Sequence, residues 1–268
     1  MLDSGKKNVL GVLVDAVDYE AATGKIVSAA RIRKGMAVSA LAVHGVMTGV
    51  LDKTYRYRLN HLDLVVPDGQ PVRWALNLLY NAKLPDRVYG PTLMTKLCEQ
   101  AAKERLPIYL FGSRAGIVEK LRANLVSRFN NLIIAGAQPS KFRRISAEEK
   151  EAVVASIRNS GAVVTLVGLG CPRQEVWVYE YREALNMPLV AVGAAFDFHA
   201  GTLRQAPPLM QRLGLEWFFR LTREPLRLWK RYVLLNPLFL ALIFLQAARL
   251  KEFDPWRTKL PEEEMRYG

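Results

Sequence analysis

The sequence predicts an α/β protein with a largely parallel, Rossmann-like sheet, flanking helices and a C-terminal helical appendage that associates with a membrane. Short β-branched or apolar runs alternate with amphipathic stretches, and unusual residues fall in the loops that follow those runs. Such alternation favours parallel strands that are covered by helices on both faces. A change of composition near Gly201 predicts two parts, an α/β core at 1–201 and the appendage at 202–268.

The apolar runs are expected to be the strands of the sheet. They cover residues 9–17, 36–43, 62–66, 107–111, 132–136, 162–168 and 188–193. Between them, a helix at 91–105 begins with Pro91, and a helix at 146–157 begins with Ser146 and Glu149 at the spacing of a capping box. Because open α/β sheets bind ligands beyond the carboxyl ends of their strands, the loops after these runs are the places to look for chemistry.

Composition and charge limit the function classes. The 268 residues, 50% hydrophobic and 24% charged, suffice for a substantial core. The three histidines and two cysteines lack metal-ligand or CxxC spacing, so no metal or other cofactor and no disulfide framework is expected, and a reducing cytosolic compartment is favoured. No signal peptide is expected. The net charge of +13 implies an anionic partner, which leaves nucleic acid, anionic lipid and a phosphate-bearing substrate open.

A carboxylate follows the 62–66 run. Asp68 stands between Pro67, which stiffens the chain, and Gly69, which permits a tight turn. A carboxylate that is held at a strand end can accept a proton from an attacking hydroxyl. The structural alternative is an ordinary turn aspartate, and the residue pattern alone leaves both open.

The loop after the 162–168 run contains Gly168 and Gly170, and Gln174 and Glu175 open the next helix. Glycine lets backbone amides approach a ligand, and a helix N-terminus favours an anion or a polar ring edge. The spacing is not GxGxxG, so ordinary turn chemistry stays open as the alternative. The neighbouring cysteine is expected only to pack.

The last strand-like run is followed by a carboxylate between two aromatic rings. Alternation along a strand would turn Phe196 and Phe198 into the core and Asp197 towards a pocket. This makes Asp197 a candidate for nucleotide binding. His199 has no partners for a catalytic triad, so it is expected at the surface or behind the site.

The segment 202–231 contains seven basic residues against two acidic ones, and an apolar run at 233–245 follows it. If Pro225 falls in a first helical turn or a tolerated kink, spacings of three, four and seven place four arginines on one helical face. They are Arg220, Arg223, Arg227 and Arg231, with Lys230 beside the last. Seventeen positions lie between Arg231 and Arg249, interrupted by Asn236, Pro237 and Gln246, which is the lower limit of the ~17 to 25 residues of a membrane span, so a span is disfavoured. An in-plane anchor on anionic lipid is expected, and the alternative is packing on a partner subunit in a homo-oligomer.

These motifs together resemble those of the WecG/TagA/CpsF glycosyltransferases, family 26. The resemblance is most specific at 167–175, 191–201 and 214–232, and it extends over most of the chain. It implies an inverting, metal-independent enzyme that moves a sugar from a UDP-sugar onto the first sugar of a polyprenyl-diphosphate lipid. Such enzymes act in bacterial exopolysaccharide or cell-surface glycan synthesis, and a β-1,4 linkage is expected. The resemblance also implies a peripheral protein at the cytoplasmic face of the cell membrane.

The same resemblance implies roles for individual residues. Asp68 would be the catalytic base, and Arg87 would be an active-site arginine. Contacts to the nucleotide sugar would come from Gly168, Gly170, Pro172, Gln174, Glu175 and Asp197. The diphosphate and the lipid acceptor would be held by Arg220, Arg223, Arg227, Lys230 and Arg231.

One segment departs from the family pattern. Where many members have Thr-x-Asn after the second strand, this chain has Ala40 and Ala42. Sugar contacts made there must change, so both UDP-glucose and UDP-N-acetylmannosamine donors stay open. Two alternatives of another class are a nucleic-acid binder and a catalytically inactive membrane scaffold. Because the chain has neither an RNP motif nor zinc-finger spacing, no nucleic-acid partner is expected.

Overall fold

The computed structural model describes residues 1–268, apart from the side chains of Pro208, Arg212, Arg227, Lys230 and Arg231. Over this range the centre of the molecule is a six-stranded sheet in the order β4-β3-β8-β7-β5-β6, with every neighbouring pair parallel. Its strands are β3 (Met36–Leu41), β4 (Leu64–Pro67), β5 (Ile108–Gly112), β6 (Ile134–Gln138), β7 (Val164–Gly168) and β8 (Pro188–Ala191). The predicted α/β class with a parallel sheet is confirmed.

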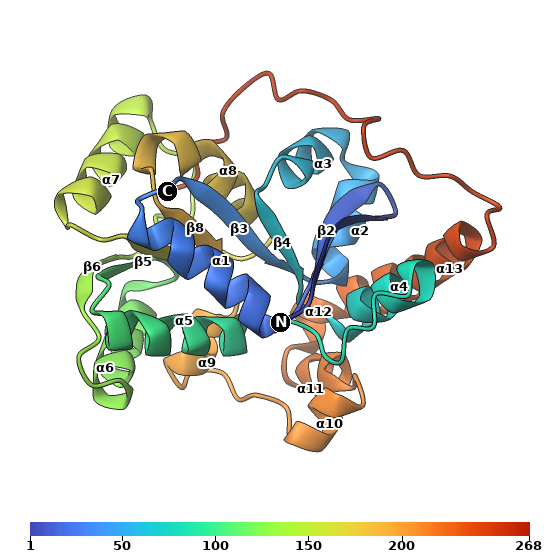
Figure 1. The fold of residues 1–268 in the computed structure, drawn as a ribbon, viewed down its shortest axis with the longest axis horizontal. Coiled ribbons are helices and arrows are strands. Elements are labelled where there is room, and N and C mark those ends of the chain that lie inside the picture. The colour runs from blue at the N-terminus through green and yellow to red at the C-terminus, as the bar shows by residue number, and fades with distance from the viewer.

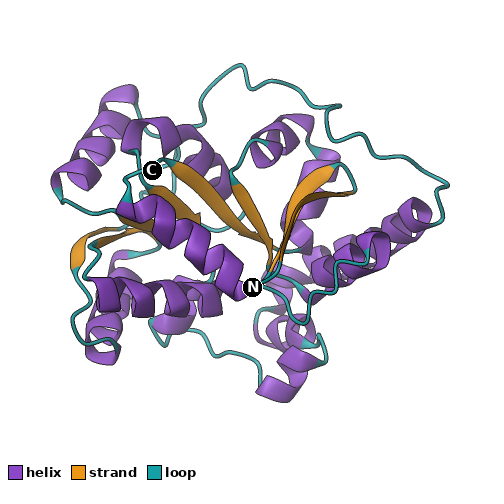
Figure 2. Ribbon diagram, viewed as in Figure 1, coloured by secondary structure: helices purple, strands orange, loops and turns teal.

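Helices cover both faces of this sheet (Figures 1 and 2). They are α1 (Tyr19–Arg31), α2 (Val43–Leu51), α3 (Lys53–Asn60), α4 (Gln70–Tyr80), α5 (Gly90–Glu104), α6 (Ala115–Arg128), α7 (Ala147–Asn159), α8 (Arg173–Leu185) and α9 (Ala195–His199). Strand side chains alternate between two cores, so that Tyr109 and Phe111 pack with α2, α3 and α8, whereas Ile108 and Leu110 pack with α1, α5 and α6. The predicted capping box of Ser146 forms at the start of α7.

The expected first strand at 9–17 is wrong as a single element. The chain forms an antiparallel hairpin of β1 (Asp3–Val9) and β2 (Val12–Val17), because Leu10 and Gly11 turn it with φ of 55° and 85°. The hairpin is a separate two-stranded sheet beside β4 (Figure 1). Asp15 joins it to the main sheet, since its carboxylate accepts the amide of Val65 at 2.7 Å.

The C-terminal residues form a set of short helices. These are α10 (Pro208–Arg212), α11 (Glu216–Arg223), α12 (Pro225–Lys230), the π-helical turn η1 (Arg231–Leu235) and α13 (Asn236–Ala247). Glu224 leaves helical geometry with φ of −134° and ψ of 56°, and Pro225 begins the next helix. The expected arginine face therefore does not lie on one continuous helix. Within the described residues, no helix combines the length and apolarity that crossing a bilayer requires.

The C-terminal helices pack on the core. Phe239 and Ile243 of α13 are buried in the same cluster as residues of α2 and α4, while Leu240 and Phe244 on the same helix are exposed. After α13 the chain returns along the outside of the molecule to a point near α7 and α8 (Figure 1). There Tyr267 forms an isolated antiparallel bridge with the segment before α7. The division of the chain at residue 201 stays a prediction.

Candidate active site

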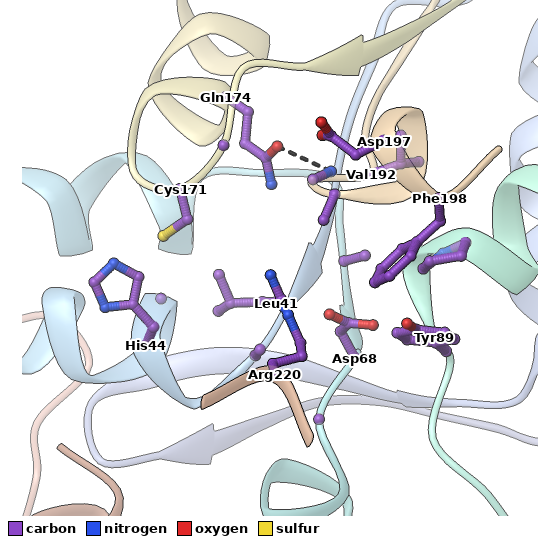
Figure 3. Close-up of a pocket in the computed structure, with 18 of the residues that line it drawn as sticks. Leu41, His44, Asp68, Tyr89, Cys171, Gln174, Val192, Asp197, Phe198 and Arg220 are labelled. Carbon is purple, nitrogen blue, oxygen red and sulfur yellow. Dashed lines mark hydrogen bonds between the residues drawn. The ribbon is translucent and has the colours of Figure 1, made fainter. Parts of the chain in front are cut away.

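A cavity of about 610 Å³ opens where the parallel strands end. Its lining comes from the segments that follow β3, β4, β5, β7 and β8, and from α11 of the C-terminal part. This is the edge at which open α/β sheets bind ligands. In Figure 3, Asp68 lies between Arg220 and Tyr89, with Gln174 and Asp197 on the opposite wall.

Asp68 directly follows β4, as the sequence predicts. Its Oδ1 accepts the amide of Gly90, the first residue of α5, at 2.7 Å. Burial in the cavity wall raises the pKa of this carboxyl to about 6, although the positive charge of Arg87 and the Gly90 amide oppose that rise. Asp68 is thus a fixed carboxylate that can take up a proton near neutral pH.

Arg87 is buried beside Asp68 and is held by a residue of the C-terminal part. Its Nη2 donates to Glu216 of α11 at 2.5 Å, and its guanidinium lies 4.1 Å from the ring centre of Tyr89. The Tyr89 hydroxyl donates to the other oxygen of Glu216 at 2.8 Å. The structure therefore brings the two predicted residues, Asp68 and Arg87, into one cavity together with a carboxylate from α11.

Two glycines, one at the end of β7 and one just after it, allow close approach of the backbone. A Cβ on Gly168 would lie 2.6 Å from the ring of Phe196, so a side chain there requires the ring to move. Gly170 has φ of 77°, a conformation that favours glycine. Both line the cavity. Pro172 follows a cis peptide bond and does not belong to the cavity lining, so the structure does not bring it together with the other predicted residues.

Gln174 and Glu175 open α8 and are both buried. The Gln174 amide accepts the backbone N–H of Gly193 at 3.0 Å and donates to Glu175 at 2.8 Å. Ser39 of β3 also donates to Glu175, at 3.0 Å. Burial raises the pKa of Glu175. These contacts tie the start of α8 to the loop after β8, and a direct contact of either side chain to a nucleotide stays a prediction.

Asp197 lines the cavity, but the argument from strand alternation is wrong. Residues 195–199 form the short helix α9, because β8 already ends at Ala191. On this helix Phe196 is fully buried, whereas Phe198 forms part of the cavity wall, 6.3 Å from the ring of Tyr89. Both rings are buried as expected, and Phe198 also contributes to the cavity wall.

The basic residues predicted in the C-terminal part do not all lie at the cavity. Arg220 lines the cavity, and its guanidinium lies 5.9 Å from the ring centre of Phe198 and 4.0 Å from Glu224. Arg223 is exposed over Phe219, outside the cavity lining. The remaining three predicted residues have side chains outside the described part. They are Arg227, Lys230 and Arg231.

Sequence reasoning missed several residues of the cavity. Glu216 was visible as one of only two acidic residues in the basic segment, but its partner Arg87 lies 129 positions away. Other residues of the lining that sequence reasoning passed over are Tyr89, Ser113, Arg114, His44 and Trp217. Cys171 also lines the cavity, 3.5 Å from the hydroxyl of Tyr55. His199 lies outside the lining, with Nε2 2.9 Å from the carbonyl of Pro91.

A Rossmann-like sheet whose strand ends enclose a carboxylate and two arginines is typical of an enzyme that acts on a phosphorylated substrate. The model of the glycosyl transferase WecG/TagA/CpsF family matches residues 7–253, and the chain belongs to this family of glycosyltransferases. It is similar to the N-acetylglucosaminyldiphosphoundecaprenol N-acetyl-beta-D-mannosaminyltransferase of Bacillus subtilis (strain 168). The two are 27% identical over 222 residues, which cover 82% of this chain and 84% of the relative. The family resemblance stated from the sequence is confirmed.

Proposed function

We propose that the protein transfers a sugar from a UDP-sugar to the first sugar of a polyprenyl-diphosphate lipid, with inversion at the anomeric carbon. One observation carries this proposal: a buried carboxylate with a raised pKa, Asp68, shares a cavity with Arg87 and Arg220. The relative's name supports the same acceptor class, because it describes transfer to a sugar diphosphoundecaprenol. The basic character of the chain fits two substrates that each contain a diphosphate.

The chemistry is a single displacement. The acceptor hydroxyl gives its proton to Asp68 while its oxygen bonds to the anomeric carbon, and the bond from that carbon to the UDP oxygen breaks on the opposite side. Negative charge then develops on the departing diphosphate. Arg220 is placed to stabilise it, and each such group contributes on the order of 2 to 4 kcal/mol in a desolvated site. In this scheme the arginines supply the charge for which other transferases use a divalent ion, so the reaction is expected to continue in excess chelator.

The donor sugar and the linkage belong to the proposal. Ala40 and Ala42 line the cavity at the end of β3 and offer methyl groups where a hydroxyl or amide would contact a sugar. The relative transfers N-acetylmannosamine, as its name states. We propose a hexose-type donor of either the UDP-glucose or the UDP-N-acetylmannosamine class, and a β-1,4 bond. Competition between the two UDP-sugars for one acceptor distinguishes the classes.

We also propose peripheral binding at the cytoplasmic face of the cell membrane. The C-terminal part has exposed apolar side chains that alternate along the sequence with basic residues, a composition that suits lipid headgroups and the upper acyl region. They include Leu209, Leu213, Phe218, Leu226, Trp229, Val233, Leu234, Leu240 and Phe244. Such a position would present the cavity to an acceptor that stays in the bilayer.

Replacement of the base tests the proposed reaction. Asp68→Asn keeps the shape of the side chain but removes its basicity, so kcat is expected to fall by at least ~10² with nearly unchanged UDP affinity. In the wild type, a base with a pKa of about 6 is ionised above that pH, so kcat should fall about tenfold per pH unit below it. Mass spectrometry of the lipid-linked product and calorimetry with UDP measure the two quantities.

Stability provides the control for this variant. Because the pKa of Asp68 is raised in the folded state, ionising it costs stability as the pH rises from its ordinary value of 3.8 through about 6. Asp68→Asn removes that cost and should raise the free energy of unfolding at pH 7, by up to about 3 kcal/mol. A stable variant with wild-type turnover would contradict the role of base.

A further inference from the structure

The ion pair between Glu216 and Arg87 is a contact between the C-terminal part and the active site that the reaction scheme does not use. Glu216 is the first residue of α11, and its side chain is only 10% exposed. One carboxylate oxygen accepts from Arg87 and the other from the hydroxyl of Tyr89. A charged pair at this depth is costly to desolvate, and replacing such a pair by apolar residues is often neutral or stabilising, so stability alone does not account for it.

The position of Glu216 on its helix links this pair to Arg220. The two residues are four apart in α11 and therefore lie on the same face. Arg220 also lines the cavity, one turn beyond the buried pair. Any rotation or lifting of α11 that moved Arg220 out of the cavity would also separate Glu216 from Arg87.

Both members of the pair also act on Asp68. The charged and titratable groups around Asp68 are Arg87, Glu216, Arg220, and the phenols of Tyr19 and Tyr89, together with the amide of Gly90. Arg87 and Arg220 lower the pKa of Asp68, whereas Glu216 raises it. An Arg87 without its carboxylate partner would be available to pair with Asp68 and would weaken it as a base.

We propose that Glu216 is a positioning residue that couples the docking of α11 to the proton acceptor. By binding Arg87 and Tyr89 it fixes α11 with Arg220 over the cavity, and it keeps Arg87 from neutralising Asp68. The inference rests on the proposed function, because it assigns Asp68 the role of base. It predicts that Asp68 is a stronger base when α11 is docked on the core than when it is not.

The test compares three variants of the full chain. Glu216→Gln keeps the shape and one hydrogen bond to Arg87 but removes the charge. Tyr89→Phe removes only the second partner of Glu216. The matched control is Glu180→Gln, because Glu180 forms a pair with Arg58 at 3.2 Å that is buried at least as deeply and lies outside the cavity lining. The two measurements are kcat against pH on a lipid-diphosphate sugar and hydrogen exchange of the α11 amides.

Glu216→Gln is expected to lower kcat about tenfold, to move its acid limb below the wild-type position near pH 6, and to speed exchange in α11. Tyr89→Phe should speed exchange in α11 by a smaller factor and leave the acid limb in place, since it changes no charge. Glu180→Gln should change neither quantity. The Tyr89 variant retains the ion pair, so it tests the docking even if Glu216→Gln does not fold.

Two results would overturn the proposal. If Glu216→Gln has the wild-type dependence of kcat on pH below pH 6 and wild-type hydrogen exchange in α11, Glu216 does not couple the docking of α11 to the basicity of Asp68. If the variant is faster than the wild type at neutral pH, Glu216 competes with the substrate for Arg87 instead of positioning it. Failure of the proposed function is a separate outcome: the wild type would then not transfer sugar, or Asp68→Asn would retain activity. The hydrogen-exchange measurement still reports whether Glu216 holds α11 on the core, because it does not depend on sugar transfer.

Discussion

The two sides of the cavity are built in different ways. On the core side, groups are placed by the backbone, because Asp68 and the loop at 192–194 directly follow strands of one parallel sheet and Gly168 is the last residue of a third strand. On the C-terminal side, Arg220 is placed by a short helix that reaches the core through the buried pair of Glu216 and Arg87. The core side is therefore fixed by many main-chain hydrogen bonds, and the position of α11 depends on a small number of side chains.

Because of this difference, we expect mutations on the core side and in the C-terminal part to have different consequences. A change on the core side has to disturb a strand end or a loop contact before it moves a catalytic group. A change in the C-terminal part can withdraw Arg220 while the sheet stays intact. Apart from replacement of the catalytic group itself, as in Asp68→Asn, stability and activity should therefore be linked on the core side and separable in α11.

The largest expected effect concerns where the C-terminal part joins the core. Phe239 of α13 is fully buried in the main hydrophobic cluster, so Phe239→Ala should lower the free energy of unfolding by about 3 to 5 kcal/mol. Leu240→Ala on the same helix is the control, because Leu240 is 54% exposed and its loss should cost under about 1 kcal/mol. Urea denaturation measures both. Equal effects of the two variants would mean that α13 does not contribute to the core.

The next largest effect is expected on kcat, when the cavity-lining arginine of α11 is removed. Arg220→Ala should lower kcat by roughly 30-fold to 10³-fold, the equivalent of 2 to 4 kcal/mol, without a large change in stability, because the guanidinium lines the cavity but ends at a partly exposed position. Assay with a water-soluble acceptor analogue removes any contribution from membrane binding. Wild-type turnover in that assay would show that the C-terminal part serves only as an anchor.

The sequence was sufficient for the core side and insufficient for the C-terminal side. Asp68 and Gly168 could be found because strand ends in a parallel sheet meet at one edge, a rule that needs only the strand pattern. The hairpin of β1 and β2 was missed, since a turn at Leu10 looks like the middle of an apolar run. Asp197 was found for a wrong reason, because it lies on the short helix α9 and not on a strand, yet it lines the cavity.

The contacts of α11 could not be predicted in the same way. The pairing of Glu216 with Arg87 joins positions 129 apart, and neither residue type indicates its partner. The helical spacing of the arginines was correct within α11 but did not extend past Glu224, where the backbone leaves helical geometry. Pro225 marked that point, and the sequence could not show how far the next helix turns away.

A smaller effect is expected where a side chain holds two loops of the core side together. Gln174→Ala would leave the amide of Gly193 without its partner and remove one of the hydrogen bonds to the carboxylate of Glu175, which keeps that of Ser39, and the loop after β8 would loosen. Affinity for UDP should fall about tenfold, measured by calorimetry. Gln100→Ala is the control, because Gln100 pairs with Glu104 in α5, away from the cavity. Unchanged affinity in Gln174→Ala would place the nucleotide elsewhere.

The smallest effect separates the two arginines of α11. Arg223 is exposed over Phe219 and does not line the cavity, so we expect it at lipid headgroups rather than at the diphosphate. A basic residue near an anionic surface contributes about 1 kcal/mol, so Arg223→Ala should weaken binding to phosphatidylserine-containing vesicles about fivefold. With a soluble acceptor its turnover should match the wild type, whereas Arg220→Ala loses turnover in the same assay. Vesicle flotation and product analysis on both variants give four values. If the two variants lose flotation and turnover in the same proportion, α11 does not divide its arginines between membrane and substrate.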